Sequence, residues 1–521
     1  MTLAIKSAHY SALPLALLPD AVSSLAHAGE FLAGIAVRHI TIDSREVQPG
    51  SLFVAVRGYC TDGHRFISSA VERGAVAVIC EEFPAVMAPS SLYIKVADSR
   101  RALAGVARIF YGKAADQLQI IGVTGTNGKT TTARLITSML NANGIPAGYI
   151  GTNLCLTGDS SVPLDRTTPE AHELHALFAL MVEAGCRAVV MEVSSHALVL
   201  QRVHGLRFHA AIFTNLTMEH LDFHTTMDEY ASAKRQLFDQ LAPDGFAVFN
   251  SDDAFAAQMA SRVAPEKIYY CTLQGGSPAP EQCRHRFDAD ILESTLASSM
   301  VALHFPERVL TMKAGLPGSF NVMNVLEAAA VGIGMELSPE EICHSLSAIS
   351  AVDGRMERVS DGSQGYSVFV DYAHTPDALF KVLETLRHLK PAASRLLLVF
   401  GCGGNRDRAK RPEMGRIASE AADVVILTSD NPRYEDPEMI LDEIERGIRG
   451  GHYMRISDRA EAIARAVAML REGDVLLVAG KGHERYQEIA GQKYPFSDQE
   501  HLINTMRKKG AGYSAKESLC H

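Results

Sequence analysis

The chain has 521 residues, of which 47% are hydrophobic and 21% are charged. This length exceeds one typical hydrophobic core and the composition is ordinary for a globular protein, so several domains are expected. The formal net charge of −10 argues against the basic stripe of a nucleic-acid-binding protein, and we predict no nucleic-acid partner.

Cysteine usage indicates the compartment. The nine cysteines are scattered, and the closest pair, Cys271 and Cys283, is too widely spaced for a thiol zinc motif. Reduced thiols and a cytoplasmic protein are therefore predicted. The apolar run at residues 11–18 is short and contains Pro14, so a secretory signal is the less favoured alternative. No run is long enough for a spanning helix.

The first block of the chain, residues 1–115, is predicted to be a small α/β domain. Short apolar runs at residues 51–56 and 75–80 are typical of strands, and residues 98–111 have helical periodicity.

The second block, residues 116–353, has a sharper pattern. A buried strand beginning at Leu118 ends in glycine, and a helix is predicted to begin at about Lys129. Further strands are expected at residues 188–193, 210–214 and 246–250, with helices between them. This alternation predicts a mainly parallel sheet with helices on both faces.

The third block, residues 354–521, repeats that alternation. Its expected strands are residues 367–370, 396–400, 424–428 and 475–478, and its expected helices are residues 376–387, 411–422, 437–448 and 459–470. The loops after these strands are polar and rich in glycine. In doubly wound sheets, ligands bind at the carboxyl ends of the strands. The chain is therefore read as three α/β domains.

A phosphate-binding loop is the strongest single motif. Residues 122–130 read GVTGTNGKT and lie between the first strand and the first helix of the second block. Glycine N–H groups and the helix N-terminus suit phosphate oxygens, Lys129 suits the β- and γ-phosphates, and the Thr130 hydroxyl suits Mg²⁺. Val123 departs from the commoner pattern, which has glycine there. The loop predicts ATP binding but no particular reaction.

Candidate metal ligands follow two later strands. Glu192 ends a buried strand, and its carboxylate is suited to Mg²⁺. His220 follows the next strand and is either a metal ligand or a hydrogen-bonded histidine. The i, i+4 pair of His220 and His224 leaves zinc as an alternative, although no third ligand is evident. Lys234 lies in an amphipathic helix and is, on chemistry alone, a solvated charge.

Nine motifs in one order carry a family resemblance: GTNGKTT, MEVSSHAL, NLTMEHLDFH, YASAKRQLF, DGRMERV, VDYAHTPDAL, FGCGGNRDRAKRP, TSDNPR and AGKGHERY. With them the chain resembles the Mur ligase family from about Thr41 to Asp498. The resemblance implies an N-terminal domain for a uridine nucleotide, a central P-loop ATPase built on a parallel sheet, and a C-terminal Rossmann-like domain for the amino acid.

The resemblance also implies roles in the ATP and metal sites. ATP is expected to contact Gly125, Thr126, Asn127, Gly128, Lys129, Thr130, Thr131, Asn324, Arg355 and Asp371. The implied Mg²⁺ ligands are Thr130, Glu192, His220 and Lys234, the last as a carbamate. Catalytic roles fall on Lys129, Lys234, His220 and His374. His374 is a candidate general base, and a nucleotide-positioning role is equally favoured.

For the sugar nucleotide, the family's binding positions match Ile42, Ser44, Thr167, Thr168, Ser194 and Arg202. The chain departs from the family at two neighbouring points. Arg166 replaces the asparagine of some members, and Leu200-Gln201 replaces a Gln-His pair.

The amino-acid positions resemble those of members that use meso-diaminopimelate: Arg406, Asp430, Asn431, Pro432, Arg433, Gly480 and Glu484. Diaminopimelate carries a second carboxylate that lysine lacks, and the planar fork of Arg433 suits that group. Glu484 suits the distal ammonium. The implied reaction joins meso-diaminopimelate to UDP-N-acetylmuramoyl-L-Ala-D-Glu through an acyl phosphate, for peptidoglycan and hence cell-wall synthesis. A monomer is expected.

Two other readings are weighed against this one. A related ligase with another amine, either the lysine-adding version or a folylpolyglutamate synthetase, is disfavoured by the Asp430–Arg433 motif. A nucleotide-switched binding protein would leave the glycine-rich loops of the third block without a purpose.

Overall fold

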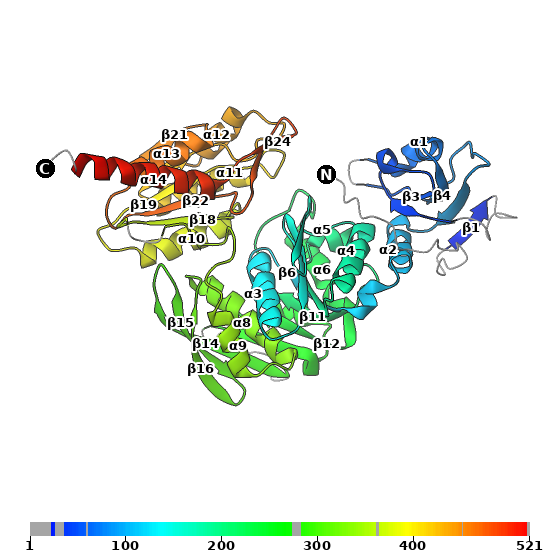
Figure 1. Cartoon of the computed structure of the whole chain (residues 1–521), viewed down its shortest axis with the longest axis horizontal. Coiled ribbons are helices and arrows are strands. Elements are labelled where there is room, and N and C mark those ends of the chain that lie inside the picture. The colour runs from blue at the N-terminus through cyan, green and yellow to red at the C-terminus, as the bar shows by residue number, and fades with distance from the viewer. Residues whose placement is uncertain are drawn as a thin grey trace. The chain divides into compact units, whose positions relative to one another are not determined.

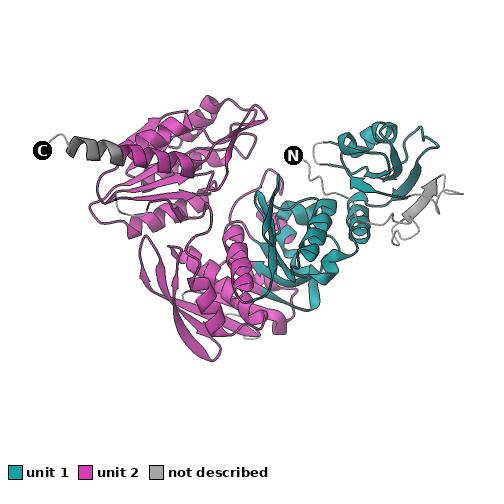
Figure 2. Ribbon diagram, in the orientation of Figure 1, with its two compact units in different colours: residues 1–124, 144–212, 233–247 teal, residues 125–143, 213–232, 248–521 magenta. Residues whose placement is uncertain are grey.

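The computed structural model describes residues 22–26, 36–58, 61–273, 283–360, 364–450 and 452–517, of which 22–26 and 510–517 are described by backbone alone. The apolar run at residues 11–18 lies outside these ranges. Within them no helix is long and apolar enough to cross a membrane, and the seven cysteines are free thiols. The chain divides into two compact units (Figure 2): unit 1 holds residues 1–124, 144–212 and 233–247, and unit 2 holds residues 125–143, 213–232 and 248–521.

Unit 1 begins with a five-stranded sheet of order β1-β5-β4-β3-β2 (Figure 1). The strands are β1 (Val22–Ala26), β2 (His39–Thr41), β3 (Ser51–Val54), β4 (Ala75–Cys80) and β5 (Leu92–Val96), and the helices are α1 (Ile67–Glu72) and α2 (Ser99–Phe110). All neighbours are parallel except β1 and β5. Asp98 caps α2 by accepting from the backbone N–H groups of Arg100 and Arg101.

The strand that leads to the phosphate loop belongs to an eleven-stranded sheet. Its part in unit 1 has the strand order β11-β6-β10-β7-β8-β9. They are β6 (Gln119–Thr124), β7 (Ala147–Gly151), β8 (Leu154–Thr157), β9 (Ser160–Pro163), β10 (Ala188–Glu192) and β11 (Phe208–Phe213), accompanied by α4 (Ala171–Glu183) and α5 (Ser195–Val199). Strand β10 is parallel to β6 and β7, whereas β7, β8 and β9 form an antiparallel meander.

Strand β12 (Leu241–Asn250) begins in unit 1 and ends in unit 2, where the run β13-β14-β15-β16 belongs to the same eleven-stranded sheet. These strands are β13 (Ile268–Thr272), β14 (His285–Ser294), β15 (Ser299–Phe305) and β16 (Arg308–Ala314), and the accompanying helices are α3 (Lys129–Ala142), α6 (Met227–Arg235), α7 (Ala256–Ala260), α8 (Ser319–Gly334) and α9 (Pro339–Ser347). Strands β14, β15 and β16 are antiparallel. The predicted mainly parallel sheet is confirmed at its centre, and antiparallel strands extend it at both ends.

The last sheet, in unit 2, has the order β17-β18-β22-β19-β20-β21. Its strands are β17 (Glu357–Arg358), β18 (Ser367–Asp371), β19 (Leu396–Phe400), β20 (Val424–Leu427), β21 (His452–Arg455) and β22 (Val475–Ala479). Helices follow as α10 (Pro376–Leu389), α11 (Lys410–Ala421), α12 (Pro437–Glu445), α13 (Arg459–Met469) and α14 (Asp498–Glu517), and a separate hairpin is formed by β23 (Tyr486–Ile489) and β24 (Gln492–Pro495).

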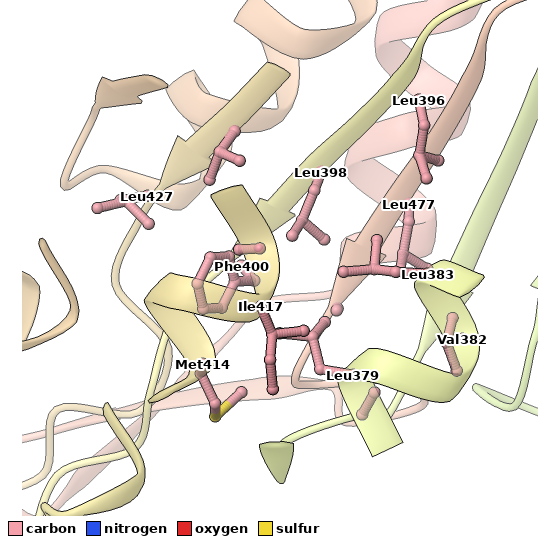
Figure 3. Close-up of a cluster of buried hydrophobic side chains, with 14 of the residues drawn as sticks. Leu379, Val382, Leu383, Leu396, Leu398, Phe400, Met414, Ile417, Leu427 and Leu477 are labelled. Atoms are coloured by element: carbon pink, nitrogen blue, oxygen red, sulfur yellow. The ribbon is translucent and has the colours of Figure 1, made fainter. Parts of the chain in front are cut away.

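Alternate residues of these strands face two cores. Leu396, Leu398 and Phe400 pack with residues of α10 and α11, as Figure 3 shows, and with residues of α12. Leu397 and Val399 pack with residues of α13 and α14. Helices thus cover both faces, as predicted. The carboxyl ends of β22, β19 and β20 are neighbours at one edge of the sheet.

Candidate functional site

The phosphate loop has the glycine-dependent geometry that its sequence predicts. Strand β6 ends at Thr124 and α3 begins at Lys129, with Gly128 as its N-cap at φ +85°. A Cβ atom on Gly125 would lie 1.9 Å from Thr214 Oγ1, and one on Gly128 would lie 2.7 Å from Asn324 Oδ1. Only glycine fits either position, so Asn324 does lie against the loop.

Lys129 is held over its own loop. Its Nζ donates to the carbonyl oxygens of Gly125 and Thr126, at 2.9 and 2.8 Å. The backbone N–H of Asn127 donates to Asn215 Oδ1 at 2.9 Å. The ammonium therefore lies at the N-terminus of α3, and a helix N-terminus is suited to a polyphosphate.

Residues from the third block also contact the loop within unit 2. Arg355 Nη2 donates to Thr130 Oγ1 at 2.7 Å, and its guanidinium lies 4.6 Å from the centre of the Tyr372 ring. Asn127 Nδ2 donates to Asp377 Oδ2 at 2.8 Å. Asp371 accepts from the backbone N–H groups of Met356 and Ala373; burial raises the pKa of its carboxyl, and Arg355 opposes that rise.

Glu219, which the sequence analysis passed over, lies between two predicted catalytic histidines. Its carboxylate oxygens are 3.6 Å from His220 Nε2 and 3.5 Å from His374 Nε2. Burial alone would raise the pKa of Glu219, but the hydrogen bond from His374 and the charges of His220 and Lys129 bring it well below its usual range. The signal for it was its place directly before His220.

The zinc alternative gains no support. Residues 214–226 have no regular helix, and His220 has a left-handed backbone at φ +57°. The His224 ring packs against Tyr230, with the ring centres 5.0 Å apart. In the described ranges no group of three or more His, Cys, Asp or Glu side chains is arranged to hold a metal ion.

Glu192 presents a buried carboxylate at the end of β10. It is only 1% exposed, and it lies in register with Val123 of β6. Oε1 accepts from the Tyr149 hydroxyl at 2.7 Å and from the Thr152 N–H at 3.1 Å. The side chain is therefore fixed by hydrogen bonds while retaining the oxygen donors that Mg²⁺ prefers.

Lys234 is not a solvated charge, so that sequence-based interpretation is wrong. Its side chain is 1% exposed, among the largest fully buried side chains of the described residues. Helical periodicity places Lys234 on α6, but it does not show which residues beside the apolar face of that helix are buried by other segments. A buried lysine needs compensation or chemical modification, because burial penalises an ammonium.

Four of the six predicted sugar-nucleotide residues lie together in unit 1. Thr168 Oγ1 accepts from the Ser194 N–H at 3.1 Å, and the Thr168 carbonyl accepts from Arg202 Nη1 at 2.9 Å. Thr167 Oγ1 lies 3.2 Å from Thr152 Oγ1. Glu170, which sequence reasoning missed, pairs with Arg202 at 2.9 Å.

The remaining sugar-nucleotide positions lie elsewhere in unit 1. Ile42 and Ser44 directly follow β2, where Ser44 is buried and Ile42 is half-buried. At the two departures from the family, Arg166 lies 3.7 Å from Glu173, and Gln201 takes a left-handed backbone at φ +56°.

The predicted amino-acid residues gather at the carboxyl ends of β19, β20 and β22. Glu484 Oε2 accepts from Asn431 Nδ2 at 2.8 Å and from Lys481 Nζ at 3.0 Å. Lys481 is fully buried and also donates to Asn431 Oδ1 at 2.9 Å. Sequence reasoning missed Lys481, although it stands between Gly480 and Glu484. A Cβ atom on Gly480 would lie 2.6 Å from Asp430 Oδ2.

Two arginines complete this cluster. Arg433 Nη1 donates to the Gly404 carbonyl at 2.7 Å, and its Nε lies 3.2 Å from Glu488 Oε2. Burial lowers the pKa of Arg406, and the like charge of Arg433 lowers it further. Pro432 links Asn431 to Arg433 and its carbonyl accepts from the Glu435 N–H. Two guanidinium groups near one carboxylate form a site for an additional anion.

Three family models match the chain in order: the catalytic domain of the Mur ligase family at residues 36–111, the Mur ligase middle domain at residues 123–332, and the Mur ligase glutamate ligase domain at residues 354–482. The chain belongs to the Mur ligase family.

Curated relatives give a more particular likeness. The UDP-N-acetylmuramoyl-L-alanyl-D-glutamate–2,6-diaminopimelate ligase of Chlorobium phaeobacteroides is 62% identical over 494 residues, which cover 95% of this chain and 96% of the relative. The protein of the same name from Geobacillus thermodenitrificans is 44% identical, over 88% of this chain and 92% of its own.

Solved structures agree. A structure of a UDP-N-acetylmuramoyl-L-alanyl-D-glutamate–2,6-diaminopimelate ligase matches with a TM-score of 0.64 and 32% identity, covering 92% of this chain and 96% of that one. MurF ligase from Thermotoga maritima in complex with ADP matches with a TM-score of 0.59 at 20% identity, over 90% and 97% of the two chains, which supports the fold alone.

Proposed function

We propose that the protein is the ATP-dependent ligase that joins meso-diaminopimelate to UDP-N-acetylmuramoyl-L-Ala-D-Glu in peptidoglycan precursor synthesis. The observation that carries the proposal is the cluster at the ends of β19, β20 and β22, where Arg406 lies close to Arg433 and Glu484 is bound by Asn431 of the same cluster. The high identity to diaminopimelate ligases supports the same choice. The proposal includes a cytoplasmic location and a monomeric protein.

ATP binds on the loop from Gly125 to Thr131. The Thr126, Asn127 and Gly128 backbone faces the phosphates, and Lys129 moves from its two loop carbonyls to the β- and γ-phosphates. Asn324, Arg355 and Asp371 contact the nucleotide from α8 and the start of the last domain. Arg355 supports this role through its hydrogen bond to Thr130.

Mg²⁺ is the proposed metal ion, since three of its four candidate ligands offer oxygen atoms and His220 offers a nitrogen. Glu192, Thr130 and His220 would hold it, together with Lys234 after CO₂ has converted its amine to a carbamate. The full burial of Lys234 supports that modification, since burial favours the neutral amine that reacts with CO₂. When bound, Mg²⁺ neutralises charge on the phosphates of ATP.

The chemistry proceeds in two steps. An oxygen of the D-glutamyl γ-carboxylate attacks the γ-phosphorus, ADP leaves, and an acyl phosphate forms, with Lys129 stabilising the added charge. The amine of diaminopimelate, having lost a proton, then attacks the acyl carbon. The tetrahedral intermediate expels phosphate and leaves an amide. His374, whose ring lies beside Glu219, is the candidate base or a nucleotide-positioning group.

Amino-acid selection rests on the second carboxylate. Arg433 and Arg406 bind that carboxylate, Glu484 binds the distal ammonium, and Asp430, Asn431, Pro432 and Gly480 shape the pocket around them. Lysine would leave a half-buried guanidinium without its anion, which costs roughly 1–3 kcal/mol. The sugar nucleotide binds in unit 1 through Ile42, Ser44, Thr167, Thr168, Ser194 and Arg202.

An oxygen-transfer experiment tests the reaction. The γ-carboxylate of the D-Glu residue is labelled with ¹⁸O, and product phosphate is analysed by mass spectrometry after turnover with diaminopimelate. One ¹⁸O atom per phosphate is expected, because the carboxylate oxygen leaves with the phosphoryl group. Phosphate without label would contradict acyl-phosphate chemistry and favour simple ATP hydrolysis, as in a nucleotide-switched binding protein.

A further inference from the structure

Glu488 contacts Asn431 and Arg433 through its backbone N–H, its carbonyl and one carboxylate oxygen. It lies on β23, outside the motifs that carry the family resemblance. Its backbone N–H donates to Asn431 Oδ1 at 3.0 Å, and its carbonyl accepts from the Arg433 N–H at 3.0 Å. Its carboxylate pairs with Arg433 Nε at 3.2 Å.

Main-chain contacts alone account for the backbone of Arg433. This residue has φ +52°, a left-handed conformation that costs energy in any residue with a Cβ atom. Its carbonyl accepts from the Ala490 N–H, and it forms a parallel bridge with Ile489. These contacts do not depend on the Glu488 side chain, so that side chain is left with a separate task.

The task follows from the donors of the guanidinium. Arg433 Nε is taken by Glu488 and Nη1 by the Gly404 carbonyl, whereas Nη2 has no protein partner in the parts of the chain that the structure describes. The two hydrogen bonds fix the plane of the Arg433 guanidinium, and the N–H groups on Nη2 are available to a ligand. The side chain is 19% exposed, so few water molecules compete.

The charged groups around Arg433 also favour a ligand carboxylate. Arg433 is close enough to Arg406 for its charge to lower the pKa of Arg406, and Glu488 is a negative group that acts on Arg406 as well as pairing with Arg433. Asp222 also acts on Arg406, whereas Glu488 is the carboxylate that pairs with Arg433. A carboxylate of the ligand would meet two guanidinium groups at this point.

We propose that Glu488 is a positioning residue for amino-acid selection, holding Arg433 by its Nε edge so that Nη2 meets the second carboxylate of the incoming amino acid. The inference rests on the proposed function, because that carboxylate belongs to diaminopimelate. A free arginine side chain samples many rotamers, and fixing it before binding lowers the entropy cost of recognition.

Steady-state kinetics of Glu488→Ala and Glu488→Gln test the proposal in the full-length protein. Glu488→Ala is expected to raise the KM for diaminopimelate about tenfold, the loss of one charge-assisted hydrogen bond, with kcat within about twofold of wild type. The KM values for ATP and the sugar nucleotide stay unchanged. Glu488→Gln keeps an oxygen acceptor for Nε and recovers most of the affinity. The matched control is Glu413→Ala, which removes an exposed partner of Arg416.

Three results would overturn the inference. The first is an unchanged KM for diaminopimelate in Glu488→Ala. The second is an equal rise of all three KM values with a lower melting temperature, which marks a structural role. The third is a Gln variant as impaired as the Ala variant. A wild-type protein inert toward diaminopimelate would overturn the proposed function as well, so the two failures are distinguishable.

Discussion

Replacing Glu327 is predicted to change the free energy of unfolding, with a sign that depends on pH. Its carboxyl group is fully buried on α8, where Oε2 accepts from Thr132 Oγ1 at 2.9 Å and Oε1 has no partner among the described residues. Burial raises the pKa of Glu327 from 4.5 to about 8, against the effect of the Thr132 hydrogen bond. The folded protein therefore retains a proton that the unfolded chain releases above pH 4.5.

The magnitude follows from linkage. The contribution of Glu327 to the free energy of unfolding is greatest below the pKa of this group in the unfolded chain. It falls by about 1.4 kcal/mol per pH unit until the pH passes the pKa of the group in the folded protein. At neutral pH the loss amounts to about 3 kcal/mol. Glu327→Gln removes this loss because an amide does not ionise. The new N–H group costs roughly 1 kcal/mol where no acceptor is present. The variant should be less stable than wild type near pH 4.5 and more stable by about 2 kcal/mol near pH 7.

Thermal unfolding from pH 4.5 to 8 measures the effect. Circular dichroism is the suitable signal, since the chain has no tryptophan. The expected gain near neutral pH corresponds to a rise of roughly 4–8 °C in melting temperature. Glu384→Gln, at an exposed glutamate of α10, is the matched control and should follow wild type. A Glu327→Gln protein that is less stable by the same amount at every pH would refute the reasoning.

Three further substitutions have expected outcomes. Lys129→Ala should abolish phosphate release while circular dichroism stays native, and near-normal turnover would remove the central role given to the phosphate loop. Arg433→Met should lower kcat/KM for diaminopimelate by roughly 10- to 150-fold, the value of hydrogen bonds to a charged group, with the KM for ATP unchanged; equal losses for both substrates would contradict it. Arg459 and Asp498 form a fully buried ion pair at 2.7 Å, so Arg459→Met should destabilise by about 3–5 kcal/mol, and adding Asp498→Leu should restore much of that in thermal unfolding. A double variant as unstable as the single one would contradict the explanation.

Much of the fold could be predicted from the sequence because its parallel strands are buried on both faces. The run LLLVF at residues 396–400 has no solvent-facing position, so composition alone marks β19 (Leu396–Phe400) as a strand. Strand β14 has a mostly exposed second half and gave no such signal, and β7, β8 and β9 alternate tight turns with short runs. The sequence therefore indicated the doubly wound parts and missed the antiparallel extensions.

The site divides in the same way. The spacing of the phosphate-loop motif is local, so Gly125 and Gly128 could be assigned from the sequence, although the side chains that exclude a Cβ atom there come from distant segments. The roles of buried charged residues could not be assigned, because the sequence does not show whether a lysine or glutamate side chain is exposed to water or buried in a core. The family resemblance alone pointed to Lys234, and Lys481 and Glu488 become functional candidates only when packing brings distant segments onto them.

Phosphate release from ATP in the presence of UDP-N-acetylmuramoyl-L-Ala-D-Glu, with meso-diaminopimelate or L-lysine added in parallel, tests the central claim most directly. We predict release that requires both the sugar nucleotide and diaminopimelate, with lysine at least about 100-fold less effective because it lacks the carboxylate for Arg433. Equal stimulation by lysine would contradict the selection cluster, and release that neither amino acid stimulates would contradict the ligase assignment itself.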